Sequence, residues 1–162
     1  MLISTSYAYY VKSIKNNDNT KVVVKTANML LRYYEGNQIN AMNIKPNWEE
    51  TLDFSIENYS GDTVGRYKIY LDIISPLTEN IDENFVYSLE ATSNKNSSTN
   101  KLVSISETSV PVSKTTLGIG TIPVGNIHNY KFKLKLKDNG QDQSYLMSRV
   151  FMAKIIVEYV YE

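Results

Sequence analysis

The chain of 162 residues contains no cysteine, and this absence excludes disulfide bonds, a thiol nucleophile and thiolate metal sites. It has 17 basic and 17 acidic residues, so no net charge favours nucleic acid or an anionic membrane as a partner. No apolar run approaches the roughly 20 residues that span a bilayer. We therefore expect no nucleic acid partner, and a membrane link only through an N-terminal signal or anchor that is absent from this sequence.

Catalytic motifs are also missing. The single histidine, His128, excludes the histidine pair of a helical zinc-peptidase motif. It stands at the entrance of a predicted strand, away from any G-x-S-x-G turn, and we expect it to be a solvated loop residue. The glycines of residues 118–125 lack dinucleotide-binding spacing and predict a bend before a strand. No pair of carboxylates stands out for glycoside hydrolysis. The sequence thus predicts a protein that is not an enzyme and has no cofactor.

Alternating apolar and polar residues are the strongest signal that is present. Residues 44–75 are predicted to form a β-hairpin, because each arm has an apolar residue at every second position. Residues 58–62 supply its turn. The inward positions are Leu52, Phe54 and Ile56 in the first arm and Tyr67, Ile69, Leu71 and Ile73 in the second. Such a unit buries only one face, so it requires a second sheet against it.

The same alternation recurs along the chain. Further strands are predicted at residues 5–15, 21–26, 28–34, 84–92, 130–137 and 151–161. Helix is limited to one turn within residues 77–83 and a short helix or long loop at 141–149, and the polar residues 93–100 are predicted to form a mobile loop. We expect an all-β fold: an antiparallel, jelly-roll-like β-sandwich of about eight to ten strands with at most one or two short helical turns. Residues 16–162 form one domain, preceded by an extended segment at 1–15.

A row of lysines is the sharpest electrostatic feature. Lys131, Lys133, Lys135 and Lys137 alternate with the apolar residues of one predicted strand, so they share its outer face. They are candidates for contact with an acidic polymer or with the acidic face of a neighbouring subunit. The interpretation we prefer is that lysines on an exposed edge strand discourage unwanted strand pairing.

Three weaker patterns are possible sites. Residues 138–143 hold Asp138 and Asp142 in a turn, as calcium loops do, but the closing glutamate is missing, so cation binding there stays open. Asp82 and Glu83 are expected to be solvated. Trp48 is a candidate for stacking on a sugar ring, although a single tryptophan in such a domain more often caps the core.

The first ten residues run from apolar to small and aromatic side chains. They have the character of the end of a secretory signal at a processing or membrane-exit point, and an ordinary first strand is the alternative. An extended segment of this kind is a natural donor of a strand to another copy. Its candidate interaction residues are Tyr7, Tyr9, Tyr10 and Val11.

Several turn and strand phrases together resemble the camelysin and TasA group of secreted bacterial β-proteins. They are Ser6-Tyr7-Ala8-Tyr9-Tyr10, Asn43-Ile44-Lys45-Pro46 before the strand ending in Ile56-Glu57-Asn58, and Ile122-Pro123-Val124-Gly125 before His128-Asn129-Tyr130. The chain departs from the pattern of this group at two places, which count against its membership of the group. Asn47 stands where the group usually has glycine, and Tyr59-Ser60 intervene before Gly61.

The resemblance implies an extracellular or surface protein of a Gram-positive-type bacterium. For the TasA branch it implies a subunit of a fibre or biofilm-matrix filament, a homo-oligomer that forms when residues 1–15 pair with the next subunit. No motif for the metallopeptidase activity claimed for camelysin can be placed on these residues. Two alternatives remain open: a monomeric surface module that binds glycan or peptide, and a viral or phage jelly-roll component.

Overall fold

A computed structural model describes residues 21–26, 29–34, 39–42, 44–61 and 63–160, and for 21–26, 29–34, 40, 60 and 61 it describes the backbone alone. Within these residues there are ten strands and one 3-10 turn, η1, at Ser144–Leu146. The strands are β1 (Lys21–Thr26), β2 (Met29–Tyr34), β3 (Ile39–Met42), β4 (Glu49–Gly61), β5 (Gly65–Ser75), β6 (Phe85–Ser93), β7 (Ile105–Ser109), β8 (Thr115–Ile122), β9 (Asn126–Leu136) and β10 (Val150–Tyr159).

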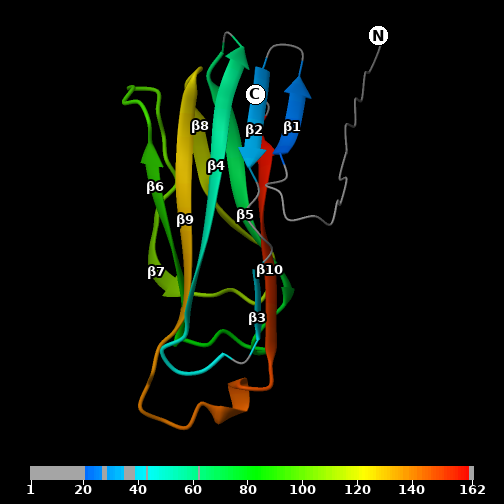
Figure 1. The fold of residues 1–162 in the computed structure, drawn as a ribbon, viewed down its shortest axis with the longest axis vertical. Helices are drawn as coiled ribbons and strands as arrows, with labels where there is room; N and C mark the ends of the chain where they lie inside the picture. Colours follow the sequence, from blue (N-terminus) through cyan, green and yellow to red (C-terminus); the bar gives the residue numbers. More distant parts are fainter. Residues whose placement is uncertain (1–20, 27–28, 35–38, 43, 62, 161–162) are drawn as a thin grey trace.

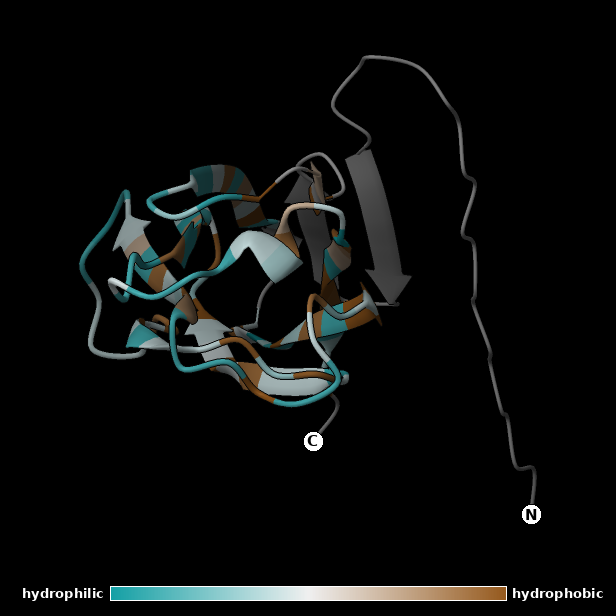
Figure 2. Ribbon diagram, turned by 90° about the horizontal axis from the view of Figure 1, so that it is seen from below, coloured by the Kyte–Doolittle hydropathy of each residue, from teal (hydrophilic) through white to brown (hydrophobic). Residues whose placement is uncertain are grey.

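The strands form two antiparallel sheets that pack face to face (Figures 1 and 2). The first sheet has the order β1-β2-β4-β9-β6-β7 and the second the order β3-β10-β5-β8. The all-β antiparallel sandwich expected from the sequence is therefore confirmed. The predicted strand and donor segment within residues 1–15 lie outside the described residues.

The predicted hairpin at residues 44–75 is wrong. β4 pairs with β2 and β9, whereas β5 pairs with β10 and β8, so the two arms belong to opposite sheets. The chain passes from one layer to the other after β4. The physical reason is that both apolar faces then meet across the core instead of lying side by side in one sheet. The alternation that defined each arm is correct, and only the pairing of the arms differs.

The core lies between the sheets, and it is formed by the alternate positions that the sequence predicted to face inward. On β9 the side chains of Tyr130, Phe132, Leu134 and Leu136 are all buried. On β10, Phe151, Ala153 and Ile155 are buried, and in Figure 2 hydrophobic positions alternate with hydrophilic ones along the strands. Trp48 packs against this core, as the capping interpretation expected. None of the helices in the described part of the chain is long and apolar enough to cross a membrane.

Gly118 and Gly120, predicted to form a bend, lie inside β8 instead, whereas Gly125 lies in the turn before β9, as predicted. An ideal Cβ on Gly120 would be 2.2 Å from Cζ of Tyr67, and one on Gly118 would be 2.7 Å from Cγ1 of Val103. Glycine in this strand therefore permits close packing of neighbouring side chains. Residues 77–83 form bends and a turn, so the predicted helical turn there is wrong.

Candidate functional site

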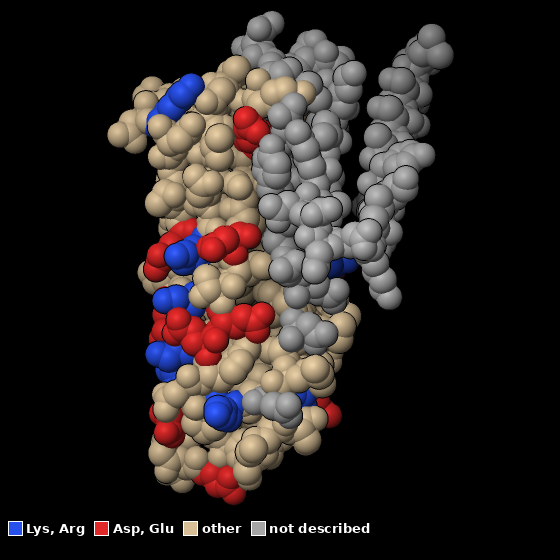
Figure 3. Space-filling view, in the orientation of Figure 1, with Lys and Arg blue, Asp and Glu red and all other residues tan. Residues whose placement is uncertain are grey.

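The lysine row lies on the outer face of the first sheet, but not on an edge. β9 is central, between β4 and β6, so edge protection is not the role of Lys131, Lys133 and Lys135. Acidic residues instead surround the row. Lys131 is directly opposite Asp53 on one side and Glu90 on the other, and Figure 3 shows red and blue residues interleaved on this face.

Ion pairs continue the same pattern along the row. Nζ of Lys133 is 3.5 Å from Oε1 of Glu49, and Lys137 pairs with Glu107. The four lysines thus have four nearby carboxylates, and their charge is largely compensated within the sheet. This arrangement weakens the case for an acidic polymer as the partner of this face. Tyr7, Tyr9, Tyr10 and Val11, the other candidate interaction residues, lie outside the described residues.

The candidate cation loop turns its oxygens toward its own backbone. Oδ1 of Asp138 accepts a hydrogen bond from the amide of Gly140 at 2.9 Å, and Oδ1 of Asp142 accepts one from the amide of Ser144 at 2.9 Å. These are local turns of the kind that aspartate forms readily. Across the residues that the structure describes, no three His, Cys, Asp or Glu side chains gather in a way that could hold a metal ion.

A buried polar chain joins the two sheets. Tyr67 on β5 and His128 on β9 are fully buried, and Oη of Tyr67 is 2.5 Å from Nδ1 of His128. Oη of Tyr67 also bonds to Oη of Tyr130, and Nε2 of His128 bonds to Oδ1 of Asn100. The expectation that His128 is a solvated loop residue is wrong. The loop at residues 93–100 reaches back to the core through Asn100.

The direction of each hydrogen bond follows from Asn100. Its Nδ2 donates to the carbonyl of Lys95 at 3.0 Å, and a carbonyl only accepts, so Oδ1 must face His128. Nε2 of His128 is then the donor and Nδ1 the acceptor. Tyr67 donates to Nδ1 and accepts from Tyr130, which accepts from the amide of Val103 at 3.2 Å.

This directed chain requires a neutral imidazole, and its surroundings favour that form. Burial lowers the pKa of His128 to about 4. Burial, and in second place the neighbouring Tyr130, raises the pKa of Tyr67 above its ordinary value. The titratable side chains that contact His128 are the phenols of Tyr67 and Tyr130. The site therefore braces the two layers with a neutral network in which Tyr67, His128 and Tyr130 are buried and only Asn100 is partly exposed, and we assign it a structural role.

We expect the chain to lose stability as the pH falls from 6.5 toward 4. In this window the unfolded chain binds a proton on His128, whereas the folded chain does not until about pH 4. Unfolding therefore becomes more favourable as the pH decreases, by about 2 kcal/mol between pH 7 and pH 5. Urea denaturation at pH 7.0, 6.0 and 5.0 would measure this slope.

The matched control for that slope is His128→Gln, which keeps polar groups at the site but does not titrate. We expect this variant to be less stable at pH 7 and to lose less stability between pH 7 and pH 5 than the original chain. Equal slopes in the two proteins would show that another group titrates there, and would contradict the assignment.

The burial of every second residue along β9 is the sequence signal that would have identified this site. His128 is two residues before Tyr130, so it shares the core-facing positions of β9, and Asn126 continues the series and is also buried. Tyr67 was predicted to face inward, and it does. The contribution of Asn100 has no such signal, because it comes from a loop that no periodicity describes.

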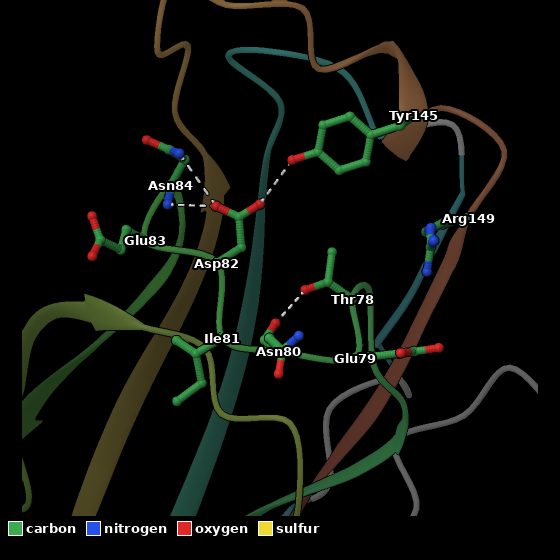
Figure 4. Close-up of a pocket in the computed structure, with 9 residues that line it drawn as sticks. All are labelled: Thr78, Glu79, Asn80, Ile81, Asp82, Glu83, Asn84, Tyr145 and Arg149. Atoms are coloured by element: carbon green, nitrogen blue, oxygen red, sulfur yellow. Dashed lines mark hydrogen bonds between the residues drawn. The ribbon is translucent and has the colours of Figure 1, made fainter.

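A second candidate site is an open hollow at the end of the sandwich that carries η1 (Figure 4). Its volume is about 600 Å³. The loop between β5 and β6 forms one side, and two residues from the η1 region form the other. The lining residues are Thr78, Glu79, Asn80, Ile81, Asp82, Glu83, Asn84, Tyr145 and Arg149.

Comparison with known proteins adds no assignment. No protein-family model, no curated protein and no solved structure matches the chain.

Proposed function

We propose that this chain is a non-enzymatic structural protein of a bacterial surface or extracellular matrix, which associates with further copies by adding an extended strand to a sheet edge. The observation that supports this most is the composition of β8. It is an edge strand of eight residues with neither a charged residue nor a proline. Edge strands normally carry such residues because they prevent pairing with another chain, so β8 is suited to accept a strand.

Backbone N–H and C=O groups of β8 also point outward, away from β5. Thr121 exchanges two backbone hydrogen bonds with Lys101, of 2.8 and 2.9 Å, on the side away from β5. Backbone groups at every second residue of a strand point to the same side, so the N–H and C=O of Ile119 face outward too. An irregularity in the β5 pairing lies before Gly118, so Ile119 belongs to the regular stretch of β8. Because Lys101 already bonds to Thr121 on the outer side, a donor strand would have to displace Lys101 in order to pair with this stretch.

We expect Ile119→Pro to abolish self-association while leaving the fold intact. Proline removes the outward N–H that a donor strand needs, and it is tolerated at edge positions whose N–H is not used within the sheet. Light scattering and negative-stain microscopy of the full chain would measure the assembly, and circular dichroism would confirm the fold.

Ile119→Val is the matched control, because it keeps the N–H and the β-branched side chain. The proposal predicts oligomers or filaments in the original chain and in Ile119→Val, and monomers in Ile119→Pro and in a version lacking residues 1–15. A compact monomer in every case would contradict the proposal. If Ile119→Pro still assembled, the edge that accepts the donor strand would not be β8.

A further inference from the structure

Exposed apolar side chains gather at the end of the sandwich that holds the hollow. Val150 pairs with Met42 at the start of β10, and Met152 pairs with Ser75, next to Ile74. Eight large hydrophobic side chains are exposed in the described residues, and six belong to this end. They are Met42, Ile74, Ile81, Tyr145, Met147 and Val150. Exposed apolar side chains that are grouped at one place, rather than scattered singly, are typical of a binding surface.

Within the hollow, Tyr145 stands opposite the β5–β6 loop. Its side chain is 54% exposed, and its hydroxyl donates to Oδ2 of Asp82 over 3.4 Å. Figure 4 shows the ring extending from η1 across the space toward Asp82. The other oxygen of Asp82 accepts from the amide of Asn84 at 2.8 Å, which fixes the carboxylate in place. An aromatic ring and an oriented carboxylate therefore face the same space.

The charges around this space are mixed. Glu79, Asp82 and Glu83 provide carboxylates, while Arg149 provides a guanidinium group whose Nη1 is 3.5 Å from the carbonyl of Leu77. A cationic ligand would meet the guanidinium group, and an anionic ligand would meet the three carboxylates. A neutral ligand with several hydroxyl groups can instead donate to the carboxylates and accept from Arg149 and the amide of Asn80.

We propose that the hollow binds one hexopyranose ring of a neutral, β-linked oligosaccharide. The flat C–H face of such a ring fits against an exposed aromatic side chain, here Tyr145, and its equatorial hydroxyls reach Asp82, Asn80 and Arg149. Open, polar depressions with one aromatic residue and a few directed polar groups suit a ligand of this class better than an apolar molecule, which requires an enclosed apolar site.

The test is a titration of the full chain with two neutral sugars, cellotriose and N,N′,N″-triacetylchitotriose, followed by NMR chemical shifts or isothermal calorimetry. We expect at least one of the two sugars to bind, with shifts concentrated at residues 78–84 and 145–149. Tyr145→Ala should weaken binding about tenfold because the aromatic contact is lost. Tyr145→Phe, which keeps the ring, should bind within about threefold of the original chain.

Tyr70→Ala is the matched control, since Tyr70 is a partly exposed tyrosine outside the hollow, contacted by Lys68 and Lys114. It should leave the affinity unchanged. A thermal melt of each variant shows that it is folded. The absence of binding by both sugars would overturn the proposal, and so would binding that Tyr145→Ala leaves unchanged. The result is independent of strand addition at β8, because the hollow and that edge share no residue.

Discussion

Replacing Gly120 with alanine is expected to lower the free energy of unfolding by about 3 kcal/mol. The new Cβ would lie 2.2 Å from Cζ and 2.3 Å from Oη of Tyr67. The ring has little freedom to move away, because Tyr67 is fully buried and bonds to both His128 and Tyr130. Either the ring leaves its hydrogen bonds or β8 shifts away from the core. Urea denaturation of the two proteins at pH 7 would measure the difference.

Gly118→Ala is the matched control for that prediction. Its Cβ would lie 2.7 Å from Cγ1 of Val103, so it is also crowded. Val103 is also buried, but it belongs to the segment between β6 and β7 rather than to a strand, so a small shift of this segment disturbs no pairing between the named strands. We expect a loss of about 1 kcal/mol for this variant. An equal cost for both variants, or a neutral Gly120→Ala, would contradict the view that Tyr67 is held rigidly over Gly120.

Tyr67→Phe is expected to lower the free energy of unfolding by about 2 kcal/mol, the second-largest effect. The change removes one oxygen and leaves two groups in the core without their partner. Nδ1 of His128 loses its donor, and the hydroxyl of Tyr130 loses its acceptor. Buried polar groups that lose a hydrogen bond are costly because water cannot replace it. Denaturation with urea, followed by tyrosine fluorescence and circular dichroism, would give the value.

The control for Tyr67→Phe is Tyr70→Phe, three positions along the same strand. Tyr70 lies on the outer side of the sheet, where its ring contacts Lys68 and Lys114. Removing its hydroxyl should change the stability by less than about 0.5 kcal/mol. If the two tyrosines gave the same small effect, the buried polar chain would not brace the sheets.

The faces of the strands could be predicted from the sequence, because a strand with one buried face requires apolar residues at every second position. The positions of Phe132, Leu134 and Ile69 in the core are examples. Strand neighbours could not be predicted in the same way. The alternation of apolar and polar residues indicates which side of a strand is buried. It does not indicate that β4 pairs with β9 rather than with β5, because that pairing depends on contacts between distant parts of the chain.

The candidate sites show the same division. The row from Lys131 to Lys137 was placed correctly on one outer face, but its acidic neighbours, Asp53 and Glu90, come from two other strands. His128 was judged by its residue type, since isolated histidines are usually solvated, when its parity with Tyr130 indicated the core. Asn100 lies in a loop and Tyr145 in the single turn η1, and both segments are too short for a periodic pattern to predict where their side chains point.

The passage of the chain between sheets has a consequence for how fast the protein folds. In the described residues only two of the eight strand pairs, β1 with β2 and β6 with β7, join strands adjacent in sequence. Glu49 must find Lys135, and Ile39 must find Ala153. Loop closure over such separations costs entropy before any contact compensates for it, so this topology predicts refolding in milliseconds to seconds. During that time β8 is exposed, and a crowded solution of new chains would compete with correct folding for its edge.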